Sequence, residues 1–200
     1  MIEILLPKIS VPEGAIDLTA LFPAAREFAF EVGFGGGEHL AVQARAYRAC
    51  GYIGCEPFLN GMAKLLTQID EGALTNVRVH MGDARDVIVR LPDQSLCAFY
   101  VLFPDPWPKL RHHKRRFVQP QTLDEIARVL KTGREFRLAT DHMEYARWAL
   151  AHLMDDRRFR WMAERASDWR VRPSDWPATR YEQKALKAGR SCVYLRFVRA

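Results

Sequence analysis

Near the start of the chain, an apolar segment runs directly into a glycine-rich turn and then into a helical pattern. Residues 27–32 (EFAFEV) have the composition of a buried strand, residues 33–37 (GFGGG) form the turn, and residues 38–47 have a helical pattern. Glycine permits a tight turn and lets the backbone approach a ligand closely. This order predicts the opening unit of a doubly wound α/β sheet. A plain tight turn is the alternative, because one glycine-rich turn is a weak signal by itself.

A second strand strengthens this interpretation. Residues 51–55 (GYIGC) have the pattern of a strand that ends at Glu56, about twenty residues beyond the glycines, and a helix is predicted over residues 58–71. In Rossmann-like sheets an acidic residue at this distance accepts hydrogen bonds from both hydroxyls of an adenosine ribose. Glu56 is therefore a candidate nucleotide ligand, and an acidic helix cap is the less favoured alternative.

Later segments continue the alternation of strands and helices. Residues 76–80 have the pattern of a strand, and Asp83 follows them; it either faces the edge of an adenine ring or caps the helix that starts at Ala84. Asp141 follows the strand predicted over residues 135–139, so it is a further carboxylate at the same edge of the sheet. The other predicted elements are strands over residues 96–102, 159–162 and 192–198 and helices over residues 119–131 and 142–155.

Residues 103–109 (FPDPWPK), which we call the Asp105 loop, begin where the predicted strand over residues 96–102 ends. Asp105 lies between two prolines, and proline restricts both its own φ and the residue before it. The loop is therefore stiff and holds Asp105 at the sheet edge where ligands bind in open α/β folds. Trp107 offers a flat surface on which a base can stack. The alternative is a rigid turn with a packed tryptophan.

A cationic segment, which we call the basic run (residues 109–116), overlaps the end of this loop. It holds five Lys or Arg and two His among eight residues, and the whole chain has a formal net charge of +6. A carboxylate, an aromatic ring and a cationic run at one sheet edge indicate chemistry on a polyanion. A solvated surface or an address signal is the alternative.

The composition is ordinary for a globular chain. Of the 200 residues, 48% are hydrophobic and 27% are charged, which favours a single domain over residues 1–200. Residues 1–26 are predicted to be irregular, because Pro7, Pro12 and Pro23 interrupt any long element.

The cysteines and the chain start bear on the compartment. The four cysteines form no CxxC pair, so buried free thiols are expected rather than disulfides or zinc, and no metal is predicted. Reduced thiols fit the cytoplasm. The first seven residues are too short and lack the basic start of a signal peptide, and no apolar run is long enough to span a membrane.

Taken together, these motifs make the chain closely resemble the bacterial tRNA (guanine-N7)-methyltransferases, from about Leu21 to its end. The resemblance implies a class I methyltransferase sheet of seven strands with the last antiparallel, S-adenosylmethionine as methyl donor, and tRNA as partner. It also implies N7 methylation of the variable-loop guanine, tRNA position forty-six. The matching segments are residues 31–40 (EVGFGGGEHL), 53–56 (IGCE), 103–109, 111–116 (RHHKRR), 139–141 (ATD) and 179–182 (TRYE).

The resemblance also implies roles for individual residues. Asp105 would be the catalytic residue and would contact the donor. The other donor contacts would be Glu31, Gly33, Gly35, Glu56 and Asp83. The target nucleotide and the tRNA would be held by Lys109, Arg111, His112, His113, Lys114, Arg115, Arg116, Asp141, Thr179, Arg180, Tyr181 and Glu182.

Two features depart from the family pattern. Family members generally carry a basic N-terminal extension, and this chain starts shorter, so it is either truncated or does without that arm. Residues 131–134 (KTGR) stand where many members have a Lys-Pro-Gly-Gly turn, and Arg134 enters a positive-φ turn less easily than glycine.

Two other functions remain open at this point. A nicotinamide-dependent oxidoreductase would also use Glu56 for a ribose, but it would give the Asp105 loop no role. A non-catalytic RNA-binding protein needs the basic run but not the acidic residues of a pocket. The oligomeric state is not predicted.

Overall fold

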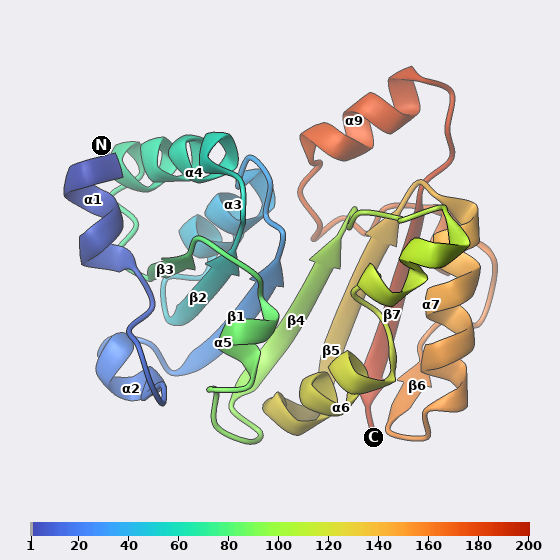
Figure 1. Ribbon diagram of the computed structural model, residues 1–200, viewed down its shortest axis with the longest axis horizontal. Helices are drawn as coiled ribbons and strands as arrows, with labels where there is room; N and C mark the ends of the chain where they lie inside the picture. Colours follow the sequence, from blue (N-terminus) through green and yellow to red (C-terminus); the bar gives the residue numbers. More distant parts are fainter. Residues whose placement is uncertain (1) are drawn as a thin grey trace.

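In the computed structural model, which describes residues 2–200, seven strands form one mixed sheet (Figure 1). The strand order is β3-β2-β1-β4-β5-β7-β6. The strands are β1 (Glu27–Val32), β2 (Cys50–Cys55), β3 (Val77–His80), β4 (Leu96–Leu102), β5 (Leu130–Thr140), β6 (Phe159–Trp161) and β7 (Val193–Arg199).

The pairing of the strands confirms the predicted fold class. Strands β1 to β5 are parallel to one another, whereas β7 runs antiparallel to both β5 and β6. All seven predicted strands are present, and the last strand is the antiparallel one. The chain leaves β1 towards β2 and leaves β4 towards β5, on the opposite side. The sheet therefore has its topological switch point between the carboxyl ends of β1 and β4, where such folds bind ligands.

Helices cover both faces of the sheet (Figure 1). One face carries α5, α6 and α7, which pack on the stacked rings of Phe30 and Phe99 and on Phe136. Helices α3 and α4 pack on the other face, where Leu40 and Leu65 are fully buried. The helices are α1 (Ile2–Ile9), α2 (Leu18–Leu21), α3 (Glu38–Ala46), α4 (Leu59–Glu71), α5 (Arg85–Ile88), the 3-10 helix η1 (Leu110–Arg115), α6 (Pro120–Val129), α7 (Met143–Asp155), α8 (Ser167–Arg170) and α9 (Arg180–Lys187).

The prediction of an irregular segment before residue 27 is wrong for α1 and α2. Helix α1 forms despite Pro7, because Leu5, Leu6 and Ile9 pack against the core that α4 and β3 share. Tertiary packing of an apolar face outweighs the loss of one helical hydrogen bond. After α1, the Val11 N–H donates to the Val79 carbonyl at 2.9 Å, so this segment covers the exposed edge of β3.

The helix predicted over residues 119–131 is shorter in the structure. Helix α6 ends at Val129, because Leu130 is extended and pairs with Leu96 as the first residue of β5. In the turn that follows, Gly133 adopts the positive φ of +78°, and Arg134 instead forms an ion pair with Glu27. The doubt that the sequence raised about Arg134 is therefore resolved, because glycine remains at the position that needs it.

The four cysteines are free thiols, as predicted, and three of them are buried. Within residues 2–200, no helix has the length and apolar composition needed to cross a lipid bilayer.

The glycine turn (residues 33–37) is held in close contact with α4. A Cβ atom on Gly61, in the first turn of α4, would lie 2.3 Å from the carbonyl oxygen of Gly35. The turn and the helix therefore approach each other at a distance that only glycine at position 61 permits.

We predict that Gly61→Ala destabilises the protein. Overpacking against backbone costs about 1–3 kcal/mol, which should outweigh the about 0.5–1 kcal/mol that alanine gains over glycine in a helix. Urea unfolding measures the difference. Gly82→Ala is the control, because its Cβ would meet only the movable ring of His80. Equal stability of the Gly61→Ala variant and the parent would show that the turn can shift away.

Candidate active site

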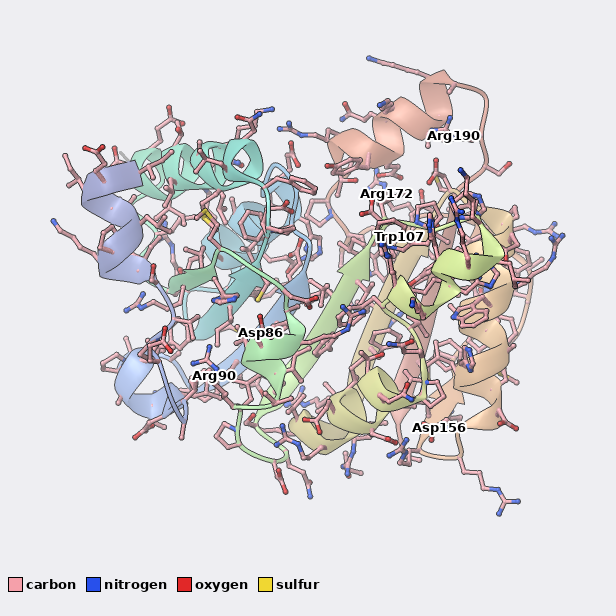
Figure 2. All side chains as sticks on the ribbon, viewed as in Figure 1. Asp86, Arg90, Trp107, Asp156, Arg172 and Arg190 are labelled. Carbon is pink, nitrogen blue, oxygen red and sulfur yellow. The ribbon has the colours of Figure 1, made fainter. Side chains whose placement is uncertain are left out.

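A cleft of about 250 Å³ opens at the switch point of the sheet, beyond the carboxyl ends of β1, β2 and β4. Figure 2 shows Trp107 in this region, beyond the ends of β4 and β5 and beneath helix α9. Four of the residues assigned to the donor by resemblance line the cleft: Gly33, Glu56, Asp83 and Asp105. Trp107 of the Asp105 loop lines it as well, and so do Arg115 and Tyr181, which were assigned to tRNA.

Glu56 is held by the backbone on two sides. The Gly35 N–H donates to its Oε2 at 2.8 Å, and the Phe58 N–H donates to its Oε1 at 3.0 Å. Burial raises the pKa of Glu56 above its ordinary value and the Asp105 carboxylate acts in the same direction, whereas the two N–H donors lower it. The carboxylate therefore has a fixed position between the glycine turn and the start of α4.

Gly35 supports Glu56 from outside the cleft lining. Its φ is +58°, and a Cβ atom on it would lie 2.5 Å from the ring of Tyr181. In the structure Gly35 donates a hydrogen bond to Glu56 and packs against the ring of Tyr181, and its contact with a donor stays a prediction.

Glu31 is buried and does not line the cleft. Its Oε2 lies 2.7 Å from Nδ1 of His39, whose ring meets Tyr100 edge to face. Nε2 of His39 is buried without a hydrogen-bond partner among the described residues. The arrangement does not support the direct donor contact predicted for Glu31.

Asp83 caps the start of α5, as one of its two predicted roles, and it also lines the cleft. Its Oδ1 accepts the backbone N–H of Arg85 at 2.9 Å, at the start of α5, and its Oδ2 pairs with Nη1 of Arg85 at 2.8 Å. Because Arg85 compensates its charge, Asp83 contributes less negative potential to the cleft than Glu56 or Asp105.

The Asp105 loop is strained at two positions, one on each side of Asp105. Phe103 has φ +52° and Trp107 has φ +43°, in the left-handed region that bulky residues rarely adopt. Such conformations cost of order 1–3 kcal/mol each and persist only where surrounding contacts hold them. Asp105, between them, is exposed and faces the cleft. The guanidinium of Arg115 lies 4.8 Å from the centre of the Trp107 ring.

The structure divides the basic run into two groups. Lys109, Arg111, Lys114 and Arg115 are exposed, as a phosphate-binding role requires. His112 and His113 are half-buried against Trp107 and Trp148, respectively.

Arg116 is 0% exposed, so the prediction that it contacts tRNA is wrong for this arrangement. Its guanidinium pairs with Glu144 instead of facing solvent.

The segment over residues 179–182 begins α9 and lies on the glycine turn. Thr179 caps the helix by accepting the Glu182 N–H, and Arg180 pairs with Glu38. Tyr181 reaches the cleft.

Glu182 is buried, where it pairs with Nε of Arg172 at 3.0 Å and accepts the hydroxyl of Tyr194. This arrangement does not support its predicted contact with the target nucleotide. Asp141 is half-buried and pairs with Nε of Arg190 at 2.7 Å.

Sequence reasoning gave no role to His39, Glu144 or Arg172, which hold Glu31, Arg116 and Glu182. Each of these partners is brought in by tertiary structure. No local pattern in the sequence predicts such a pairing.

Comparison with known proteins is consistent with a methyltransferase fold at this site. Residues 25–195 match a family model described as a putative methyltransferase. The tRNA (guanine-N(7)-)-methyltransferase of Nitrobacter hamburgensis is 48% identical over all of this chain and 80% of that protein. That of Ruegeria pomeroyi is 52% identical over 92% of this chain and 77% of that protein.

Among solved structures, the 16S rRNA methyltransferase KamB has a similar fold. It superposes with a TM-score of 0.62 at 16% identity, over 94% of this chain and 96% of that one. This likeness concerns the fold alone.

The raised pKa of Glu56 predicts a pH-dependent stability. An acid whose pKa is higher in the folded state binds more protons there, so its contribution is fully present below the ordinary value of 4.5 and is lost as pH rises through the raised value. We expect the free energy of unfolding of the parent, minus that of Glu56→Gln, to fall as pH rises above 4.5. Urea titrations at several pH values measure it, with exposed Glu71→Gln as the control. A difference that grows with pH would contradict this environment for Glu56.

Proposed function

Because this chain belongs to the tRNA (guanine-N7)-methyltransferase family, we propose that it transfers a methyl group from S-adenosylmethionine to N7 of a tRNA guanine. The guanine we propose is the variable-loop base at position forty-six. One observation carries the proposal best: a cleft lined by Glu56, Asp83 and Asp105 lies at the switch point of the sheet, beside the exposed cations Lys109, Arg111 and Lys114, which we call the rim. Such a site suits a cationic donor inside and a polyanion outside.

The residues of the cleft fit the proposed donor. Glu56 is fixed by two backbone N–H groups, and its remaining lone pairs can accept the two ribose hydroxyls. The donor is cationic at sulfur, so Glu56 and Asp105 attract it. A nicotinamide dinucleotide could also use Glu56 for its ribose, but it would leave Asp105 and the neighbouring exposed cations without a role. We therefore favour the methyl donor over the oxidoreductase alternative.

The proposed methyl transfer requires little proton transfer by protein side chains. When bound, S-adenosylmethionine supplies a methyl group already activated by the sulfonium. Guanine N7 has a free lone pair at neutral pH, so no residue has to act as an obligatory base. We propose that the Asp105 carboxylate accepts hydrogen bonds from the N–H groups of the guanine and so orients the base. The same carboxylate stabilises the positive charge that the guanine ring gains on methylation. Holding the reactants in line is the protein's main contribution, because proximity alone can supply roughly 7–11 kcal/mol.

The residues at the mouth of the cleft can hold both an extruded base and the phosphates of a folded tRNA. A base in a folded RNA is stacked or paired, so it must be extruded to reach a cleft. Trp107 presents a ring at the cleft, where it can form a wall for that base. The exposed Lys109, Arg111 and Lys114 are placed to bind phosphates. A non-catalytic RNA-binding protein would have no use for the carboxylates behind this rim.

We also propose that residues 1–200 act as one domain, because all seven strands belong to one sheet. The proposed setting is the cytoplasm, where free thiols persist and tRNA is modified.

Incubation with unmodified tRNA and methyl-labelled donor, followed by nucleoside analysis, tests the function. Label in N7-methylguanosine at position forty-six is the expected result. Label in another nucleoside, or none, would contradict the proposal.

We predict that Asp105→Asn slows methyl transfer by roughly 10²-fold, because the amide removes a charge that stabilises the cationic ring. Single-turnover methylation at saturating donor and tRNA measures the rate, and a thermal melt checks the fold. The control is Asp86→Asn, an exposed residue of α5 labelled in Figure 2, which should react at the parent rate. A normally folded Asp105→Asn variant with the parent rate would make Asp105 structural.

A further inference from the structure

Arg116 is the last residue of the basic run, yet it is among the largest fully buried side chains of the described residues. The preceding residues of the run, Lys114 and Arg115, are exposed. An arginine is rarely fully buried unless its charge is paired, so this one has a structural partner rather than a phosphate.

The guanidinium of Arg116 joins two segments that flank the site. Towards the Asp105 loop, its Nε donates to the Pro106 carbonyl at 3.0 Å and its Nη2 to the Trp107 carbonyl at 3.3 Å. Towards α7, its Nη1 donates to Oε1 of Glu144 at 3.0 Å, and its Nη2 donates to the other carboxylate oxygen. Arg116 therefore bridges the loop that carries Asp105 and the first turn of α7.

Aromatic contacts complete the enclosure of Arg116. Its guanidinium lies 4.8 Å from the centre of the Trp148 ring, and that of Tyr145 is 5.8 Å away; both rings belong to α7. Trp148 also donates from Nε1 to the Val118 carbonyl at 2.6 Å, so the chain just after Arg116 is bound to the same helix. The position of Arg116 is thus set by α7 together with the Asp105 loop.

The carbonyl that Arg116 binds belongs to a strained residue. Trp107 has a positive φ of +43°, a conformation that needs outside contacts to persist. Hydrogen bonds from a charged donor to the carbonyls of Pro106 and Trp107 are such contacts, and they act directly after Asp105. The Arg116 hydrogen bond holds the pKa of Glu144 below its ordinary value, which favours the charged carboxylate as its partner.

We propose that Arg116 and Glu144 are positioning residues for methyl transfer, which clamp the Asp105 loop in its reactive conformation, and that Arg116 does not bind RNA. The inference rests on the proposed function, because it concerns the residue assigned to that reaction. It predicts that removing the Arg116–Glu144 interaction lowers kcat without weakening the binding of tRNA.

Arg116→Lys and Glu144→Ala test the clamp. Lysine keeps the positive charge, so it would preserve a phosphate contact, but a single ammonium cannot span two carbonyls and both oxygens of a carboxylate. Glu144 is half exposed, so its truncation should leave a folded protein even if changes at Arg116 do not. For both variants we expect kcat with saturating tRNA to fall about tenfold or more, with the KM for tRNA and its salt dependence unchanged.

Hydrogen–deuterium exchange of residues 103–109 gives a second readout that does not depend on activity. Exchange there should be faster in both variants than in the parent. If the parent itself does not methylate tRNA, the proposed function fails, and the exchange result still decides whether the clamp exists.

Two matched variants separate the possible roles. Lys114→Ala removes an exposed cation from the same run, and should raise the KM for tRNA and reduce the salt slope by roughly 0.7–0.9. Asp155→Ala removes a carboxylate from the far end of α7, and should leave exchange and kcat at parent values. The proposal is overturned if Arg116→Lys behaves as the parent in kcat and exchange, or if Glu144→Ala raises the KM for tRNA with unchanged exchange.

Discussion

Several segments of the chain meet on the backbone of the glycine turn, and only residues without a Cβ leave them room. Gly61 of α4 approaches the Gly35 carbonyl, the Tyr181 ring lies on Gly35, and the Arg180 guanidinium lies on Gly36. The same turn donates an N–H to Glu56. Because these contacts share one short stretch of backbone, the cleft, the start of α4 and the start of α9 are placed together.

Charged groups around the site lie in an inner zone, the cleft, and an outer zone, the exposed part of the basic run. Carboxylates outnumber cations in the inner zone, which is lined by Glu56, Asp83, Asp105, Arg85 and Arg115. The outer zone holds Lys109, Arg111 and Lys114. In the proposed reaction, the inner zone attracts a cationic donor and the outer zone attracts tRNA phosphates. Between the two zones lies a strained loop, which has to be held by buried contacts because its own backbone conformation is unfavourable.

Local sequence patterns predicted the strands, the glycine turn and the position of Glu56, because each depends on a period or a spacing within one unit. They failed where a distant element decides the outcome. Helix α1 exists because its apolar face packs on the core it shares with α4 and β3, and Arg116 is buried because α7 supplies Glu144 and Trp148. Glu31 and Glu182 were assigned to ligands, and the structure pairs one carboxylate oxygen of each with a side chain distant in sequence or from another element, His39 and Arg172 respectively. A charged residue in a motif indicates the kind of group it can bind. Whether its side chain faces the cleft or pairs inside the protein depends on the tertiary structure.

Calorimetric titration tests most directly whether the cleft beside Glu56 binds S-adenosylmethionine. S-adenosylmethionine should bind the parent, and NAD should not. Affinity should fall about 10- to 100-fold in Glu56→Ala, because hydrogen bonds to a charged acceptor contribute about 1.5–3 kcal/mol. Unchanged affinity in a folded Glu56→Ala variant, or binding of NAD at the same site, would contradict this assignment of the cleft.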